Sequence, residues 1–223
     1  MKERPILFSG PMVRAILDGK KTQTRRVMKP QPEYSDRLTC WLWDRAGHKR
    51  MWDSIATNAP PYGFSQDCWI PLSPYGQRGD RLWVRESFFD HGDLPDGTVL
   101  ERDERIEYRA SEWNRVDSAD GGPWKPSIHM PRWASRITLE LTDVRVQRVQ
   151  EIADADVEAE GIEHDGQWWR AGTHPVKGTL QCWPSRQRAF ERLWNELNDK
   201  RGYSWHVNPW VWALTFKRVE SAA

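Results

Sequence analysis

Residues 19–26 read Gly-Lys-Lys-Thr-Gln-Thr-Arg-Arg and gather two amines, two hydroxyls and two guanidinium groups in one short segment. A lysine acts as a general base only when desolvation or neighbouring cations lower its pKa. The adjacent lysine and the two arginines supply the second effect for Lys21, and Thr24 carries a hydroxyl that such a base can activate. Because Lys21 and Thr24 would point to opposite faces of a regular strand, their pairing requires a turn. The alternative is an ordinary exposed segment at the start of a strand.

Glu160 is a second candidate for chemistry. It falls in the last turn of a helix that we predict over residues 154–160, directly before Gly161. A carboxylate there faces the negative end of the helix dipole, which raises its pKa and suits a group that both donates and accepts a proton. The alternative is an exposed glutamate that tolerates a small loss of stability.

Other constellations are weaker. Cys40, Cys68 and Cys182 lack the close pairing of a structural zinc site, and the Ser-x-His triplets at 127–129 and 204–206 lack the sequence context of a nucleophile elbow. We therefore expect no metal and no cofactor. Three cysteines without a close pair fit a reduced, cytoplasmic protein.

The composition is that of a folded protein rather than a disordered one, with 38% hydrophobic and 29% charged residues in a chain of 223. No apolar run approaches the roughly 20 residues that cross a bilayer, and the first residues do not resemble a secretory signal, so we expect no membrane partner. The net charge is only +1, but residues 1–29 contain eight basic and two acidic residues. That segment is either a site for an anionic or nucleic-acid partner or a solvated basic face. The 15 tryptophans could stack on bases, although for any single one packing is the more common role.

The elements that must position these residues follow from periodicity. We predict a short helix after Ser9-Gly10-Pro11 that ends at Gly19, a helix at about Asp154–Glu160 and a stronger one over Ser185–Asn198. Predicted strands cover Arg81–Phe88, a stretch near Thr98, Ile106–Arg109, Arg136–Thr142 with a continuation through Val146, and Trp210–Val219. The class is therefore α+β, with a mixed sheet curled towards a small barrel, short flanking helices and long Trp-rich insertions.

Several of these segments match one family. Gly19-x-Lys21-x-x-x-x-Arg26 resembles the signature of the ASCH superfamily, relatives of the PUA domain. The segments 79–84, 152–162 and 208–216 are similar to the next strand, the acidic helix and the closing strand of that family. The resemblance is closest to small bacterial N4-acetylcytidine amidohydrolases, and the longer chain is similar to versions carried by phages. It implies one domain over 1–223, with insertions at about 30–78 and 88–130.

The resemblance also implies roles for individual residues. Lys21 would be the base, Thr24 the nucleophile and Glu160 the acid/base of an acyl transfer from a modified cytidine nucleoside. We further predict that Arg26, Trp83 and Glu86 bind the substrate. Two alternatives stay open: an RNA-binding module without catalysis, in which Lys21 and Arg26 contact phosphate, and a ribonuclease.

Overall fold

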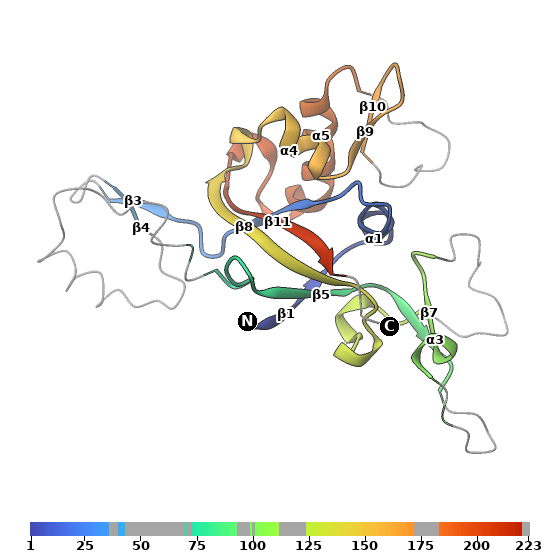
Figure 1. The fold of residues 1–223 in the computed structure, drawn as a ribbon. Helices are drawn as coiled ribbons and strands as arrows, with labels where there is room; N and C mark the ends of the chain where they lie inside the picture. The colour runs from blue at the N-terminus through green and yellow to red at the C-terminus, as the bar shows by residue number, and fades with distance from the viewer. Residues whose placement is uncertain are drawn as a thin grey trace, which may run out of the picture.

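A computed structural model describes residues 1–35, 40–42, 70, 73–92, 99, 101–111, 124–171 and 183–219 (Figure 1). Its centre is a five-stranded mixed sheet. In spatial order the strands are β1 (Glu3–Leu7), β5 (Arg81–Arg85), β8 (Thr138–Arg148), β11 (Trp210–Val219) and β2 (Gln23–Val27). β1 and β5 are parallel, and the other neighbouring pairs are antiparallel.

The two long strands, β8 and β11, form the middle of the sheet because their apolar side chains reach the core: those of β8 alternate, whereas residues 210–214 of β11 are buried in succession. Leu139, Leu141, Val144 and Val146 of β8 are buried. The sequence suggested an interruption at Asp143, and the structure instead has one continuous strand whose register with β11 shifts between Thr215 and Phe216. An irregularity of this kind bends a strand without ending it.

Three two-stranded sheets accompany the central one. They pair β3 (Glu33–Ser35) with β4 (Cys40–Leu42), β6 (Phe88–Asp90) with β7 (Ile106–Tyr108), and β9 (Ile162–His164) with β10 (Trp169–Ala171). The predicted strand 81–88 is therefore divided into β5 and β6, and the strand predicted near Thr98 lies outside the described residues. Much of the predicted insertion at 30–78 is also outside them. β6 and β7 belong to the second predicted insertion and share a small core with Met130 and Ala134.

Three helices begin and end close to where the sequence predicted: α1 (Gly10–Leu17), α4 (Asp154–Ala159) and α5 (Arg186–Asn198). The short α3 (Arg102–Arg105) was not predicted. The 3₁₀ turns are η3 (Ser127–His129), η4 (Arg132–Ala134), η5 (Val149–Glu151), η6 (Asp199–Arg201) and η7 (Trp205–Val207). α4 and α5 pack together on one side of the sheet, with β9 and β10 beside them (Figure 1). The Ser185 side chain caps α5 by accepting from the Arg188 amide. No described helix is long and apolar enough to cross a bilayer.

The α+β class is confirmed, but the described strands do not close into a barrel. β1 and β2 stand at opposite ends of the strand order and are not paired with each other. The sheet is nevertheless curled enough to bring its two edge strands near each other. The Arg26 guanidinium of β2 donates a hydrogen bond to the Leu7 carbonyl oxygen of β1. A side chain therefore spans the gap that a further row of backbone hydrogen bonds would close in a barrel.

Candidate active site

Lys21 lies in the turn between α1 and β2. Gly19 adopts φ +72°, a left-handed conformation that suits glycine, and the Lys20 and Lys21 amides both donate to the Ala15 carbonyl oxygen. This turn directs the Lys21 side chain inwards, where only 1% of it is exposed. Desolvation lowers the pKa of Lys21, although the charge of Glu160 opposes the shift. The lowered pKa comes mainly from burial rather than from the neighbouring cations that the sequence suggested.

Glu160 is the partner of that lysine. The Lys21 Nζ atom lies 2.8 Å from Glu160 Oε2 and 2.7 Å from the Glu160 carbonyl oxygen. Glu160 caps the C-terminus of α4, and its side chain is 5% exposed, so it is not the solvated glutamate of the alternative interpretation. Its second carboxylate oxygen accepts from Arg25 Nη1 at 3.1 Å. The carboxylate is thus held between two buried cations.

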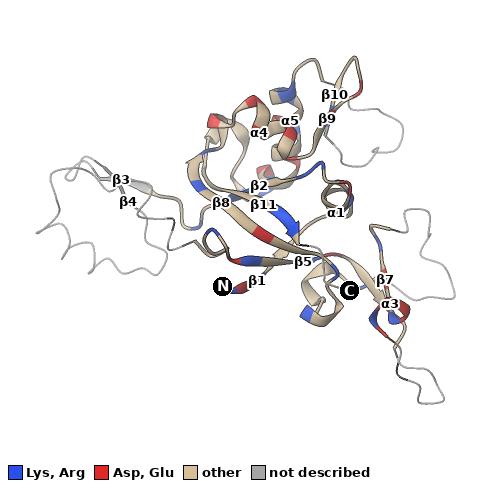
Figure 2. Ribbon diagram, viewed as in Figure 1, with Lys and Arg blue, Asp and Glu red and all other residues tan. Residues whose placement is uncertain are grey.

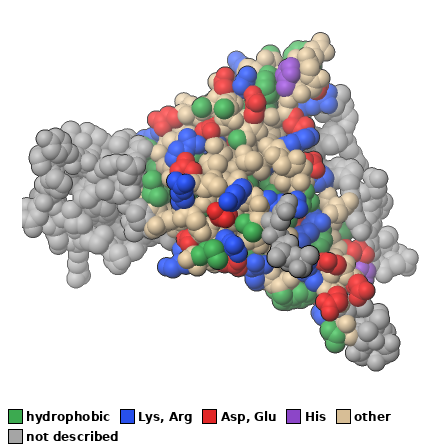
Figure 3. Space-filling model, in the orientation of Figure 1, with side chains coloured by type: hydrophobic (Ala, Val, Ile, Leu, Met, Phe, Trp, Pro, Cys, Tyr) green, Lys and Arg blue, Asp and Glu red, His purple; other side chains and the backbone are tan. Residues whose placement is uncertain are grey.

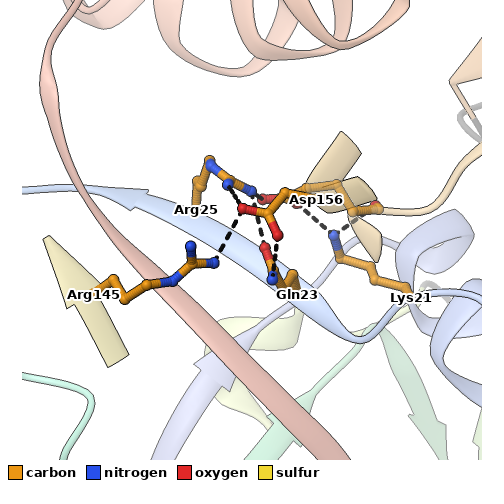
Figure 4. A network of polar contacts seen from close by, with 6 residues as sticks. Lys21, Gln23, Arg25, Arg145 and Asp156 are labelled. Atoms are coloured by element: carbon orange, nitrogen blue, oxygen red, sulfur yellow. Dashed lines mark hydrogen bonds and ion pairs between the residues drawn. The ribbon is translucent and has the colours of Figure 1, made fainter. Parts of the chain in front are cut away.

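A further layer of polar contacts fixes this group (Figure 4). The Arg25 guanidinium also donates to Asp156 at 2.8 Å, and Asp156 accepts from Gln23 at 2.8 Å and from Arg145 at 3.0 Å. These side chains come from β2, β8 and α4, so the network joins the sheet to the helix that carries Glu160. Charge-assisted hydrogen bonds in a region of low dielectric constant are strong and directional.

Sequence reasoning missed Asp156 and Gln23 and treated Arg25 only as a nearby cation. Asp156 stands four residues before Glu160, a spacing that places both carboxylates on one face of α4. Gln23 and Arg25 stand two residues apart on β2, a spacing that places both side chains on one face of the strand. These two spacings could have indicated the network, but the sequence does not show that the helix packs on the strand.

Thr24 lies on β2, opposite Leu214 of β11, and is buried. Within the described part of the chain, no hydrogen bond to its hydroxyl is found. Thr24 and Glu160 line the same cavity, which has a volume of about 690 Å³. Lys21 does not line the cavity and reaches it through its contact with Glu160. Thr24 and Glu160 thus share one cavity, and Lys21 contacts Glu160 without lining that cavity.

The cavity lies between the ends of the two edge strands and is bounded by α5. Its lining includes Leu7, Phe8 and Ser9 at the end of β1, Thr24, Arg25, Arg26 and Val27 of β2, and Phe190, Leu193, Trp194 and Leu197 of α5. Leu197 is the most exposed of these α5 residues, with 43% of its surface accessible. The volume falls within the range of small-molecule sites, about 300–1,000 Å³.

The three predicted substrate-binding residues differ in position. Arg26 lines the cavity, and its guanidinium lies 5.0 Å from the centre of the Phe8 ring. Trp83 and Glu86 are not among the lining residues. Trp83 lies on β5, where its ring packs against an arginine side chain. Glu86 is buried in a bidentate ion pair with Arg136, at 2.9 and 3.0 Å. Trp83 and Glu86 are therefore not part of the proposed site.

The basic N-terminal segment is not one free basic face. Lys21 and Arg25 are buried against Glu160 and Asp156, Arg4 pairs with Asp80, and Lys20 pairs with Glu163. On the face shown in Figure 3, basic side chains are interspersed with acidic ones, and the ribbon in Figure 2 shows the same mixture. Among the described residues, no group of three His, Cys, Asp or Glu side chains could hold a metal ion.

Comparison of the chain with models of protein families, with curated proteins and with solved structures found no match.

Proposed function

We propose that this protein is an amidohydrolase that removes an acyl group from the exocyclic nitrogen of an N4-acylcytidine nucleoside, of the type that the ASCH resemblance implies. The relation to the ASCH barrel is part of the same proposal. The observation that carries it is the buried ion pair between Lys21 and Glu160, 2.8 Å apart, beside a cavity that Thr24 and Glu160 both line. Such a pair of titratable groups with a nearby hydroxyl is an arrangement suited to acyl transfer.

The ion pair can supply both protonation states that the reaction requires. If one proton moves along the hydrogen bond from Lys21 Nζ to Glu160 Oε2, the amine becomes neutral and the carboxyl becomes an acid. Burial lowers the pKa of Lys21 and so favours release of its proton. The pair holds the same number of protons before and after the shift, so base and acid arise together without exchange with solvent.

The reaction then proceeds in two stages. Neutral Lys21 accepts the proton of the Thr24 hydroxyl while the oxygen attacks the acyl carbon, and Glu160 gives its proton to the exocyclic nitrogen as the C–N bond breaks. In the second stage Glu160 accepts a proton from water, whose oxygen attacks the Thr24 ester, and Lys21 returns its proton to the Thr24 oxygen. The products are cytidine and a carboxylic acid, and both residues return to their starting states.

Arg26 is the candidate for stabilising the negative charge that develops on the acyl oxygen. Its guanidinium lines the cavity with Thr24 and is held by Leu7 and the Phe8 ring. A donor fixed in this way need not reorganise when charge develops, which is the main source of such stabilisation.

The burial of Lys21 argues against the alternative of a purely RNA-binding module. In that alternative Lys21 contacts phosphate, whereas its ammonium is almost without exposure and already donates to Glu160. No contact of the described residues specifically favours a ribonuclease.

The test is hydrolysis of N4-acetylcytidine, followed by the change in its absorbance. Thr24→Ala should lower kcat/KM by about a thousandfold or more, since it removes the nucleophile. Thr22→Ala is the matched control, because Thr22 is exposed, two residues away and outside the cavity lining. Full turnover by Thr24→Ala, or absence of turnover by the wild-type protein on a panel of acylated cytosines, would refute the proposal. Salt-sensitive RNA binding that Thr24→Ala leaves intact would then favour the binding module.

A further inference from the structure

The same cavity carries an excess of positive charge away from the buried ion pair. Four of its lining residues are cationic, and Arg25 is neutralised by Glu160 and Asp156. The other three are Arg26, Lys29 and Arg201, for which no ion pair with a described residue is found. Glu160, the one carboxylate among the described lining residues, is already occupied by Lys21 and Arg25.

These three cations come from separate elements and converge. Arg26 lies on β2, Lys29 follows that strand, and Arg201 ends η6. The Lys29 ammonium lies 5.5 Å from the centre of the Tyr203 ring, which itself lines the cavity two residues after Arg201. Burial lowers the pKa of Arg26; the charges of Tyr75 and Glu160 oppose this shift, and the positive charge of Arg201 adds to it. Cations that outnumber the carboxylates of a cavity provide a site for an anion.

The lining changes in character with depth. Thr24 and Glu160 are buried, whereas Lys29 and Arg201 are exposed at the mouth. Phe8 and Trp212 are buried aromatic residues that also line the cavity. The buried end thus holds the reactive groups and the aromatic side chains, and the exposed end holds cations, which suits a nucleotide that enters with its base first and its phosphate last. Aromatic faces bind bases by stacking, and guanidinium and ammonium groups bind phosphate.

We propose that the substrate is a phosphorylated cytidine rather than the free nucleoside, with its phosphate bound by Lys29 and Arg201 at the mouth of the cavity. The identity of the base rests on the proposed function, and the assignment of a phosphate rests on the three cations.

The test measures binding without catalysis. Isothermal titration calorimetry of the full chain with cytidine and with cytidine 5′-monophosphate gives the ratio of the two dissociation constants. We expect the monophosphate to bind about tenfold more tightly at low salt, and the ratio to fall as ionic strength rises. In Lys29→Gln/Arg201→Gln the ratio should approach one. Lys200→Gln removes an exposed charge one residue from Arg201, outside the cavity lining, and should leave the ratio unchanged.

Equal binding of cytidine and its monophosphate by the wild-type protein would overturn the inference, as would an equal loss of the ratio in Lys200→Gln. A short cytidine oligonucleotide, titrated in parallel, identifies the source of the phosphate: tighter binding than the monophosphate assigns the cationic mouth to a nucleic-acid chain. The two proposals fail separately. Hydrolysis of N4-acetylcytidine with no preference for phosphate refutes only the phosphate site, whereas a phosphate preference without hydrolysis of either acylated form refutes only the amidohydrolase.

Discussion

At the scale of single residues, the site depends on how burial changes the proton affinity of an amine. Lys21 lies where a charged ammonium is poorly solvated, so desolvation lowers its pKa from the ordinary value of 10.5, while Glu160 stabilises the protonated form. A lysine that is almost always protonated in water can therefore act as a base.

This shared proton predicts a pH dependence. The reaction starts with neutral Lys21 and protonated Glu160, which hold one proton between them, so activity should fall as pH rises through the lowered pKa of Lys21, at a pH below 10.5, because Glu160 then has no proton to give. Lys21→Arg should lower kcat by about a hundredfold to ten-thousandfold, because guanidinium stays protonated throughout that range. The measurement is a pH–rate profile on an acylated cytidine. Lys20→Arg, exposed and paired with Glu163 at 3.0 Å, should keep the wild-type profile. Near-normal activity of Lys21→Arg would remove Lys21 from the role of base.

At the scale of elements, the end of α4 and the turn after α1 must pack closely for Lys21 to reach Glu160. Gly161 ends the helix with φ +91°, and the Thr22 amide donates to the Ala159 carbonyl oxygen just before it. A Cβ atom at Gly161 would lie 3.4 Å from the Lys21 Cβ and 3.5 Å from the Ala15 Cβ. The glycine therefore serves the backbone conformation rather than the approach of the lysine.

Two glycine substitutions measure the cost of such a conformation. Gly166 also has a positive φ, +97°, but a Cβ there would meet nothing within 4 Å. We expect Gly166→Ala to lower the free energy of unfolding by about 1–2 kcal/mol, from backbone strain alone. Gly161→Ala should cost about the same and keep activity, because its methyl group would meet Lys21 and Ala15 only at ordinary van der Waals distances. Urea unfolding and kcat measured on both variants test this, and a markedly larger loss in Gly161→Ala would show that the site does not accept a methyl group beside Lys21.

At the scale of the whole molecule, stability is unevenly distributed over the sheets. β8 and β11 each have a paired strand on both sides and supply many residues of the main core. The β6–β7 and β9–β10 pairs are ladders of two short strands. Such ladders are marginally stable and depend on what packs against them.

Native-state hydrogen exchange should reflect this difference. Amides in the centres of β8 and β11 are expected to exchange only through global unfolding, so their opening free energies should equal the free energy of unfolding. Amides of β6 and β7 should open with lower free energies and with a weaker dependence on urea. Mass spectrometry or NMR of the full chain measures both sets. Equal opening free energies throughout would show that the small sheets unfold together with the central one.

The sequence by itself determined the elements that depend on local chemistry. The apolar period and Ser185 predicted α5, Gly19 predicted the end of α1 and the turn that Lys21 requires, and alternation predicted β8. The inferences about these elements hold because caps, glycines and periodicity act over a few residues. Lys21, Thr24 and Glu160 were selected partly from their residue types and mainly from the resemblance to the ASCH family.

Only the tertiary structure decided which of those residues meet. Lys21 and Glu160 are 139 positions apart, and nothing in either segment specifies the other. Packing of α4 on β2 brings them together, adds Asp156 to the site, and leaves Trp83 and Glu86 outside the cavity lining. Pairing of distant strands likewise left the described sheet open, with Arg26 across the gap. Contacts between distant segments depend on how whole faces fit against one another, and a local pattern does not contain that information.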